Sequence, residues 1–355
     1  MKILLISHTY PPIVGGVETQ NFELFTWLSR GAEVRLIANR KRWLIPFFLM
    51  WIPIRLIFSA RKYDIIILGS CLTANAGWFV KKLTKTPVLA VTHGLDLTWK
   101  NALYQKLWVG VFAPSLDRLV AVGNETIRAG VARGIAAEKF VFIPNGVDTE
   151  KHRGTHSREE LEKILDETLE QKKVLLTSGR LAKRKGVAWF IRNVMPKLPE
   201  TVLYVVAGSG PDKENIERAI SETGLTARIK MLGYVTDAVR NTLFNTCDLF
   251  IQPNIKVEGD MEGFGISVIE AGACRLPVIA ARLEGLQDAI KDGQNGFLVE
   301  PNDADDYVKK INELLADDDL RKQFGEKARQ FVIDNYSWDR IVAMYLREIE
   351  KIVKK

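Results

Sequence analysis

The sequence predicts an α/β protein of two domains, each built on a doubly wound, Rossmann-like parallel sheet. Short apolar segments alternate with helix-like segments in both halves of the chain, which is the pattern of such sheets. The alternation stops once, in a charged stretch at residues 149–172, and then restarts. A chain of 355 residues suits two domains of roughly 150–200 residues each.

Six segments of the first half are expected to be strands, at residues 2–7, 34–38, 64–69, 87–91, 118–122 and 141–143. They are apolar along most of their length, as strands buried on both faces of a parallel sheet are. Helices are expected between them, at about residues 17–30, 73–83, 98–113 and 124–133.

The second half repeats this architecture without a short sequence repeat, with strands expected at residues 173–179, 202–208, 228–232, 249–252, 278–280 and 297–299. Residues 149–172 are interpreted as a linker region with one polar helix. The predicted domains therefore cover residues 1–168 and 169–336. The remaining residues, 337–355, place apolar side chains along one stripe of a helix.

The composition is that of a soluble globular protein, with 47% hydrophobic and 26% charged residues. The first residues are expected to form a buried strand and not a signal peptide. No uninterrupted run of about 18 apolar residues is found, so no membrane-spanning helix is predicted. The three cysteines are widely spaced, which predicts neither a disulfide nor a metal framework and favours a reducing cytoplasm.

The charge is uneven along the chain. Residues 1–148 contain 18 Lys and Arg against 9 Asp and Glu, whereas the remainder contains 32 against 34. A basic first half predicts an anionic partner for that half alone. Because no nucleic-acid-binding motif is found, an anionic membrane surface is the favoured partner and nucleic acid is not expected.

Residues 43–58 combine tryptophans and large apolar residues with basic flanks. Two prolines, Pro46 and Pro53, are expected to break the segment, and it is too short to span a bilayer. Such a segment is typical of a membrane interface, although a hydrophobic helix buried in the first domain is the alternative. The side chains expected to contact membrane or acceptor are Arg40, Lys41, Arg42, Trp43, Phe47, Phe48, Trp51 and Arg55.

The most informative motif begins at Glu262 and ends at Glu270. Between these carboxylates lie Gly263, Phe264, Gly265 and Ile266, where a helix is expected to begin. Its glycines allow close backbone approach, and the first-turn amides of the helix suit a phosphate. The two carboxylates are about two helical turns apart, so they could hold opposite ends of one extended ligand, such as a nucleotide joined to a sugar.

Three further motifs follow expected strands, at the edge where ligands of such sheets bind. Gly15 and Gly16 open a helix and could approach a diphosphate or a sugar. His93 could hydrogen-bond a sugar hydroxyl or stabilise developing charge. Arg180 and Lys185 flank a turn and could together neutralise a departing diphosphate without a metal.

Asp303 and Asp305 form an Asp-x-Asp triplet, which in other enzymes holds a metal. Here the triplet is interpreted as a helix cap followed by acidic residues in the first turn, because an apolar periodic segment comes directly after it. No metal and no other cofactor is therefore predicted.

These motifs, in this order, resemble those of family 4 retaining glycosyltransferases, which have the GT-B fold of two Rossmann-like domains around an interdomain cleft. The resemblance spans nearly the whole chain, from the Tyr-Pro-Pro…Gly-Gly-x-Glu loop to the E-x7-E motif. Arg275 departs from the small glycine that is usual there. Gln287 and Asp288 stand where the family often has a Glu, which leaves the donor preference open.

The resemblance implies a role for each matching residue. Arg180, Lys185, Glu262 and His93 would be catalytic, with Glu262 and His93 near the transferred sugar. Glu270 would hold the ribose, and the base would lie near Tyr234. The donor nucleotide-sugar site would comprise Gly15, Gly16, Gly179, Gly210, Tyr234, Val235, Gly263, Phe264, Gly265, Ile266 and Glu270. The C-terminal helix, residues 337–355, would return to the first, acceptor-binding domain.

The expected activity is transfer of a hexose from a UDP- or GDP-linked donor to a glycan or lipid-linked acceptor, with retention and without metal. The enzyme would be peripheral to the inner face of the cell membrane, in the cytoplasm. Two alternatives remain open: a GT-B sugar-nucleotide epimerase, and a non-catalytic, membrane-associated carbohydrate-binding protein.

Overall fold

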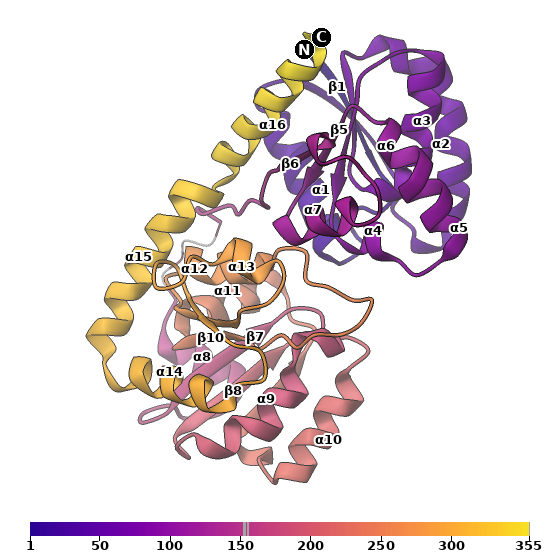
Figure 1. Cartoon of the computed structure of the whole chain (residues 1–355). Helices are drawn as coiled ribbons and strands as arrows, with labels where there is room; N and C mark the ends of the chain where they lie inside the picture. Colours follow the sequence, from indigo (N-terminus) through magenta and orange to yellow (C-terminus); the bar gives the residue numbers. More distant parts are fainter. Residues whose placement is uncertain (152–153, 155, 355) are drawn as a thin grey trace. The chain divides into compact units, whose positions relative to one another are not determined.

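The computed structural model describes residues 1–151, 154 and 156–354, and divides the chain into two compact units. Unit 1 comprises residues 1–146, 259–264 and 338–355, and unit 2 comprises residues 147–258 and 265–337. Each unit is an α/β fold around one parallel sheet (Figure 1). The prediction of two doubly wound parallel sheets is therefore confirmed.

The sheet of unit 1 has six parallel strands in the order β2-β1-β3-β4-β5-β6. They are β1 (Lys2–Ser7), β2 (Glu33–Ala38), β3 (Ile65–Leu68), β4 (Val88–Thr92), β5 (Arg118–Ala121) and β6 (Phe140–Phe142). The residues of β3 and β4 are all fully buried, because helices cover both faces of the sheet. Strands as apolar as these were the basis of the predicted sheet.

The helices of unit 1 are α1 (Gly16–Leu28), α2 (Ile45–Ser59), α3 (Ala74–Leu83), α4 (Leu95–Thr98), α5 (Ala102–Tyr104), the π-helix η4 (Gln105–Phe112), α6 (Ala113–Ser115), α7 (Asn124–Val131) and α16 (Trp338–Val353). Short 3-10 turns are η1 (Arg42–Leu44), η2 (Ala60–Lys62), η3 (Cys71–Thr73) and η5 (Ala137–Lys139). The C-terminal α16 packs against α1 in this unit. Its buried side chains include Trp338, Ile341, Tyr345 and Ile349, which belong to the predicted stripe.

One predicted helix of unit 1 is different in the structure. The continuous helix expected at residues 98–113 begins instead at Ala102, where the Asn101 side chain accepts a hydrogen bond from the Tyr104 N–H at 2.9 Å. Residues 105–112 then wind as a π-helix. A separate short helix, α4, comes after His93 and ends at Thr98, before the helical stretch that begins at Ala102.

The sheet of unit 2 has six parallel strands in the order β12-β11-β10-β7-β8-β9. They are β7 (Lys173–Ser178), β8 (Val202–Ala207), β9 (Ile229–Gly233), β10 (Leu249–Gln252), β11 (Val278–Ala281) and β12 (Phe297–Val299). Its helices are α8 (Arg158–Leu165), α9 (Val187–Asn193), α10 (Lys213–Thr223), α11 (Asp237–Thr246), α12 (Ile266–Ala273), α13 (Leu286–Ala289), α14 (Ala304–Ala316) and α15 (Asp318–Tyr336). The 3-10 turns are η6 (Lys183–Lys185), η7 (Met195–Lys197) and η8 (Thr226–Arg228).

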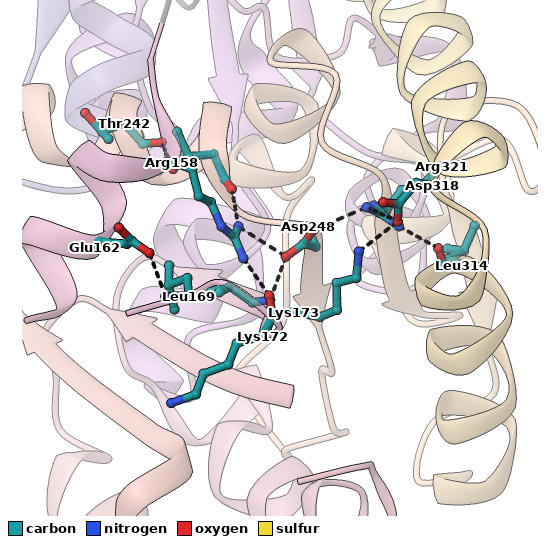
Figure 2. Close-up of polar contacts among 12 residues, drawn as sticks. Arg158, Glu162, Leu169, Lys172, Lys173, Thr242, Asp248, Leu314, Asp318 and Arg321 are labelled. Carbon is teal, nitrogen blue, oxygen red and sulfur yellow. Dashed lines mark hydrogen bonds and ion pairs between the residues drawn. The ribbon is translucent and has the colours of Figure 1, made fainter. Parts of the chain in front are cut away.

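The boundary between the units lies at residue 146, earlier in the chain than the predicted position at residue 168. Helix α8, expected in a linker, is instead tied to the sheet of unit 2. The Arg158 guanidinium donates to the Lys172 carbonyl at 2.7 Å and lies 3.3 Å from an Asp248 carboxylate oxygen (Figure 2). The same carboxylate accepts from the Val174 N–H at 2.7 Å, so one partly buried acid joins α8 to β7.

The Asp-x-Asp triplet at residues 303–305 caps a helix, as predicted. The Asp303 carboxylate accepts a hydrogen bond from the Asp306 N–H at 3.0 Å, at the N-terminus of α14. Asp305 instead forms an exposed ion pair with Lys197. One carboxylate therefore caps the helix, and the other binds a lysine.

Candidate active site

The loop after β1 is fixed at the carboxyl edge of the first sheet by a buried carboxylate. Glu18, in the first turn of α1, accepts a hydrogen bond from the Thr9 hydroxyl at 2.6 Å. Gly15 and Gly16 lie where α1 begins, and a Cβ atom on Gly15 would lie 2.4 Å from a Glu18 carboxylate oxygen. The two glycines therefore stand at the sheet edge where ligands of doubly wound folds bind.

His93 follows β4 at the same edge and is held at two points. Its backbone N–H donates to Asp96 Oδ1 at 2.9 Å, while Asp96 Oδ2 accepts from the Cys71 N–H at 3.0 Å. The ring Nε2 lies 3.0 Å from the Gly69 carbonyl oxygen. Because a carbonyl only accepts, Nε2 carries a proton, and in the neutral ring Nδ1 is left as an acceptor.

A second imidazole, that of His8, lies near His93. Burial, and after it the charge of His93, lower the pKa of His8 from its usual 6.5 to about 4. Its Nδ1 is buried and has no hydrogen-bond partner among the residues that the structure describes. The sequence predicted that both loops lie at this edge of the sheet, but nothing in it indicated that His8 and His93 would be neighbours.

Glu262 belongs to unit 1, although it lies in the connection between β10 and α12 of unit 2. Residues 259–264 fold against the loop that carries His93. A Cβ atom on Gly263 would lie 2.5 Å from the His93 carbonyl oxygen, so only a glycine allows this approach. Met261 also packs close to a glycine, because a Cβ atom on Gly94 would lie 3.1 Å from the Met261 sulfur. Glu262 is 7% exposed. The structure thus brings the predicted Glu262 and His93 segments together.

Arg180 and Lys185 follow β7 at the carboxyl edge of the second sheet. Arg180 is exposed, whereas Lys185 is 8% exposed in the turn η6. Gly186 ends this turn with a φ of 68°, and a Cβ atom there would lie 1.8 Å from the Pro253 carbonyl oxygen. The glycine therefore lets the Lys185 turn lie directly against the end of β10.

The loops after β7 and β8 are joined through their backbones. The Gly179 N–H donates to the Ala207 carbonyl at 2.9 Å, and the Leu181 N–H donates to the Ser209 carbonyl at 2.9 Å. Gly210 lies against the Leu181 backbone. Gly179, Arg180 and Gly210, which were predicted to share a site, thus belong to one connected layer.

Helix α12 begins at the predicted motif, with Gly265 as its N-cap residue. Phe264 is buried and Ile266 is half-buried. Glu270 is 7% exposed, and one of its carboxylate oxygens lies 3.5 Å from a guanidinium nitrogen of Arg240 on α11. Arg240 could not be found by pattern, because it occupies an ordinary position of a polar helix.

Tyr234 and Val235 follow the last residue of β9, again at the carboxyl edge of the second sheet. The Tyr234 side chain is 69% exposed and Val235 is half-buried. An aromatic ring this exposed beside a strand end is available for stacking on a planar ligand.

The predicted site residues therefore form two sets, one on each unit. Unit 1 holds the set Gly15, Gly16, His93, Glu262, Gly263 and Phe264. Unit 2 holds the set Gly179, Arg180, Lys185, Gly210, Tyr234, Val235, Gly265, Ile266 and Glu270. The two sets differ in chemistry: the first has one imidazole and one carboxylate, and the second has a pair of cations suited to phosphate together with the carboxylate of Glu270.

Residues 42–62 correct one prediction and refine another. The prolines do not break the segment, because Pro46 lies in the first turn of α2 and Pro53 is accommodated within it. The helical stretch of 21 residues is long and apolar enough to cross a membrane by length and composition, contrary to our expectation. A single helix of this kind is weak support for a span, since core helices meet the same criteria.

One face of α2 is core and the other is exposed. Phe48, Ile52 and Leu56 recur every four residues and are buried, so the predicted membrane contact of Phe48 is wrong. Trp43, Phe47 and Trp51 are 68%, 65% and 47% exposed, respectively. The basic residues Arg40, Lys41, Arg42 and Arg55 are exposed as well.

Comparison with known proteins identifies two family models along the chain. The model described as Glycosyltransferase Family 4 matches residues 14–151, and the model described as Glycosyl transferases group 1 matches residues 158–331. A glycosyltransferase of Methanocaldococcus jannaschii is 26% identical over 379 aligned positions, which cover 96% of both chains. A GDP-mannose-dependent alpha-(1-6)-phosphatidylinositol monomannoside mannosyltransferase of Mycolicibacterium smegmatis is 24% identical and covers 95% of both.

Solved structures share the fold. A glycosyltransferase from Rickettsia africae superimposes with a TM-score of 0.83 at 22% identity, covering 100% of this chain and 99% of that one. The Anabaena protein HepE, solved in complex with UDP, gives a TM-score of 0.81 at 20% identity, covering 99% and 100%. The two family models favour a transferase over the epimerase and the carbohydrate-binding protein. The chain belongs to glycosyltransferase family 4 and has the GT-B fold.

Proposed function

We propose that this glycosyltransferase moves a hexose from a nucleotide-diphosphate sugar to a lipid-linked or cell-envelope glycan acceptor, with retention of configuration. The observation that carries the donor assignment is the turn at the end of β7, which holds a buried Lys185 and an exposed Arg180. A diphosphate brings the complementary charge. The base, uridine or guanosine, stays open, because the similar proteins named above use or bind either.

The chemistry follows from the charge that the leaving group acquires. As the bond between the sugar C1 and the β-phosphate oxygen breaks, negative charge develops on the diphosphate, and Arg180 and Lys185 neutralise it. The acceptor hydroxyl forms the new bond to C1 on the same face and passes its proton to the departing phosphate oxygen. Two fixed cations suffice for this charge, so we propose that no metal is required.

The remaining residues bind and orient the substrates. Glu270, positioned beside Arg240, would accept hydrogen bonds from the ribose hydroxyls, and Tyr234 would lie near the base. Glu262 would accept hydrogen bonds from sugar hydroxyls, and the imidazole ring of His93 would hydrogen-bond them as well. Each of these groups offers an acceptor to a donor hydroxyl, which is the chemistry that carbohydrate recognition needs.

The acceptor would be reached at the inner face of the cell membrane, from the cytoplasm. The exposed side of α2, with Trp43, Phe47 and Trp51 and its basic neighbours, supports contact with an anionic membrane surface. A protein that lies on the surface in this way is peripheral, which suits an acceptor held in the bilayer.

The donor can be identified by thermal stabilisation. UDP-glucose, UDP-N-acetylglucosamine and GDP-mannose should be compared, and a ligand at 100 times its Kd adds about 2.7 kcal/mol of stability. The stabilising donor is then incubated with membrane lipids, and release of nucleoside diphosphate and labelling of lipid are measured with and without EDTA. No stabilisation by any nucleotide sugar would contradict the donor assignment, and loss of turnover with EDTA would contradict metal independence.

A further inference from the structure

The excess positive charge of the first half is confined to one part of it. Residues 40–116 contain 11 Lys and Arg but only two acids, Asp64 and Asp96. Residues 1–39 carry three of each sign, and residues 117–148 carry four of each. Both acids are engaged, Asp64 with the Lys2 N–H and Asp96 with the His93 loop. An anionic partner is therefore expected on α2, α3 and the segment from α4 to η4.

The same residues carry most of the exposed apolar surface. Of the 20 large apolar side chains that are exposed in the described part of the chain, 13 lie between Trp43 and Val111. They include side chains of α2 and three side chains that follow His93 in the sequence. These three, Leu95, Trp99 and Leu103, are 50%, 51% and 64% exposed. Apolar exposure together with basic charge is the signature of contact with a charged bilayer and its interior.

Trp99 is exposed on a rigid support. Its ring packs edge-on to Tyr104 at 5.0 Å, and Tyr104 stacks on Trp108 at 5.5 Å with an angle of 13° between the rings. The Tyr104 hydroxyl donates to the Asp96 carbonyl at 2.7 Å, and the Trp108 indole N–H donates to the Leu72 carbonyl at 2.8 Å. The structure therefore orders the residues around Trp99 while leaving its ring half in solvent.

The segment of residues 95–103 and helix α2 are linked through a third helix. Helix α3 joins them within unit 1, because Asn75 donates to the Leu49 carbonyl of α2 at 2.9 Å and η4 packs against α3 (Figure 1). Helix α2 begins shortly after β2, and α4 begins shortly after β4. Both beginnings therefore lie at the carboxyl edge of the parallel sheet, the edge that also carries His93.

We infer that residues 95–103 form a second lipid contact, so that an anionic phospholipid bilayer reaches the carboxyl edge of the first sheet beside His93. Leu95, Trp99 and Leu103 insert among the lipids, while Lys106 and the basic residues around α2 face the headgroups. The acceptor is then a membrane lipid whose reacting hydroxyl stays at the level of the headgroups. This inference rests on the proposed function only in taking the acceptor from a membrane.

Single labelled cysteines test the inference directly, because the three native cysteines are buried. Leu103→Cys, Met50→Cys on α2 and Val131→Cys on α7 are each labelled with the fluorophore NBD, all three positions being exposed. Vesicles of phosphatidylcholine with 30% phosphatidylglycerol are then added. We expect a blue shift and an intensity gain of about twofold or more at positions 103 and 50, none at position 131, and little change with pure phosphatidylcholine.

The possible outcomes separate the two proposals. A response at position 50 without one at position 103 overturns the second contact and leaves the membrane-bound enzyme intact. Silence at both positions removes the proposed membrane association as well. A response at position 103 that follows protein concentration without lipid would instead indicate a second copy of the chain, and it would also overturn the inference.

A binding measurement gives an independent test. The double variant Trp99→Ser/Leu103→Ser should bind the anionic vesicles at least about tenfold more weakly in sedimentation, because it removes two inserting apolar side chains. Val131→Ser is the matched control and should bind as the parent protein does. Equal binding by the double variant, with an unchanged thermal midpoint, would overturn the inference.

Discussion

Each of the two units has its own sheet of six parallel strands, but the surfaces of their helices differ in charge and in exposed apolar side chains. Helix α2 of unit 1 has Arg55 as its one charged residue in 15 and exposes Phe47, Met50 and Phe58. Helix α10 of unit 2 alternates acids and bases, with Lys213 and Glu217 3.3 Å apart in an exposed ion pair. The two units thus have the same kind of scaffold, and they differ in the residues on their surfaces.

The largest effect is expected at the turn of unit 2 that we propose binds phosphate. Lys185→Ala should lower kcat/KM by about 10²–10³-fold, because the leaving diphosphate loses a fixed, nearly buried cation. Lys183→Ala, in the same turn but exposed, is the matched control and should change the rate by less than about twofold. Donor turnover is measured for both, and equal rates in the two variants would contradict the role of Lys185.

The exposed face of unit 1 should matter for membrane binding and not for donor hydrolysis. Phe47→Ser/Trp51→Ser is expected to weaken binding to anionic vesicles by about tenfold or more, since two apolar side chains no longer leave water. Phe22→Ser, on the exposed side of α1, serves as control. Binding is measured by vesicle sedimentation. Equal binding by the double variant and the control would contradict the proposal.

The lowered pKa of His8 in unit 1 predicts that the stability of the protein depends on pH. His8 has a pKa of about 4 in the folded protein and about 6.5 when unfolded, so the unfolded chain takes up its proton first as pH falls. The contribution of neutral His8 is therefore complete above pH 6.5 and is lost as pH falls toward 4. In urea unfolding at pH 7.5 and 4.5, His8→Asn should lose less stability than the parent protein. Parallel losses would contradict the assignment.

The smallest effect concerns Arg275, where the family usually has a glycine. Its φ of 63° is left-handed, which a glycine adopts without cost. Arg275→Gly should change the unfolding free energy by no more than about 1 kcal/mol, in the stabilising direction, while Arg275→Ala should bring no gain. A loss of stability in the glycine variant would show that the ion pair with Glu326, at 2.5 Å, outweighs the backbone term.

Much of the fold could be predicted because each strand can be recognised from its own run of apolar residues. The boundary between the units could not, because Arg158 looks like part of a solvated linker until the fold brings Asp248 beside it, some 90 residues away in sequence. Proline was a poor guide in α2: Pro46 lies where no N–H is needed, and buried neighbours on one face hold the helix through Pro53.

The place of a motif residue in the fold was predictable where a short motif follows a strand, as at His93 and Arg180, and the roles of these residues stay predictions. Contacts between motifs were not, because spacing along the chain says nothing about which strand ends become neighbours. His8 beside His93 and Arg240 beside Glu270 are both of this kind. Phe48 shows the limit of composition: an aromatic residue among exposed aromatics is core because of its position on the helix.

The docking of residues 259–264 in unit 1 has a consequence for dissecting this enzyme. The chain passes from one unit to the other four times, so neither unit is an unbroken piece of sequence. A fragment ending at Gly146 would lack both Glu262 and Trp338, whose ring lies against Gly146. A separately expressed first half would therefore lack two segments of unit 1, and the second half would carry those two segments without the rest of that unit. Chimeras between relatives must exchange the three segments of unit 1 together.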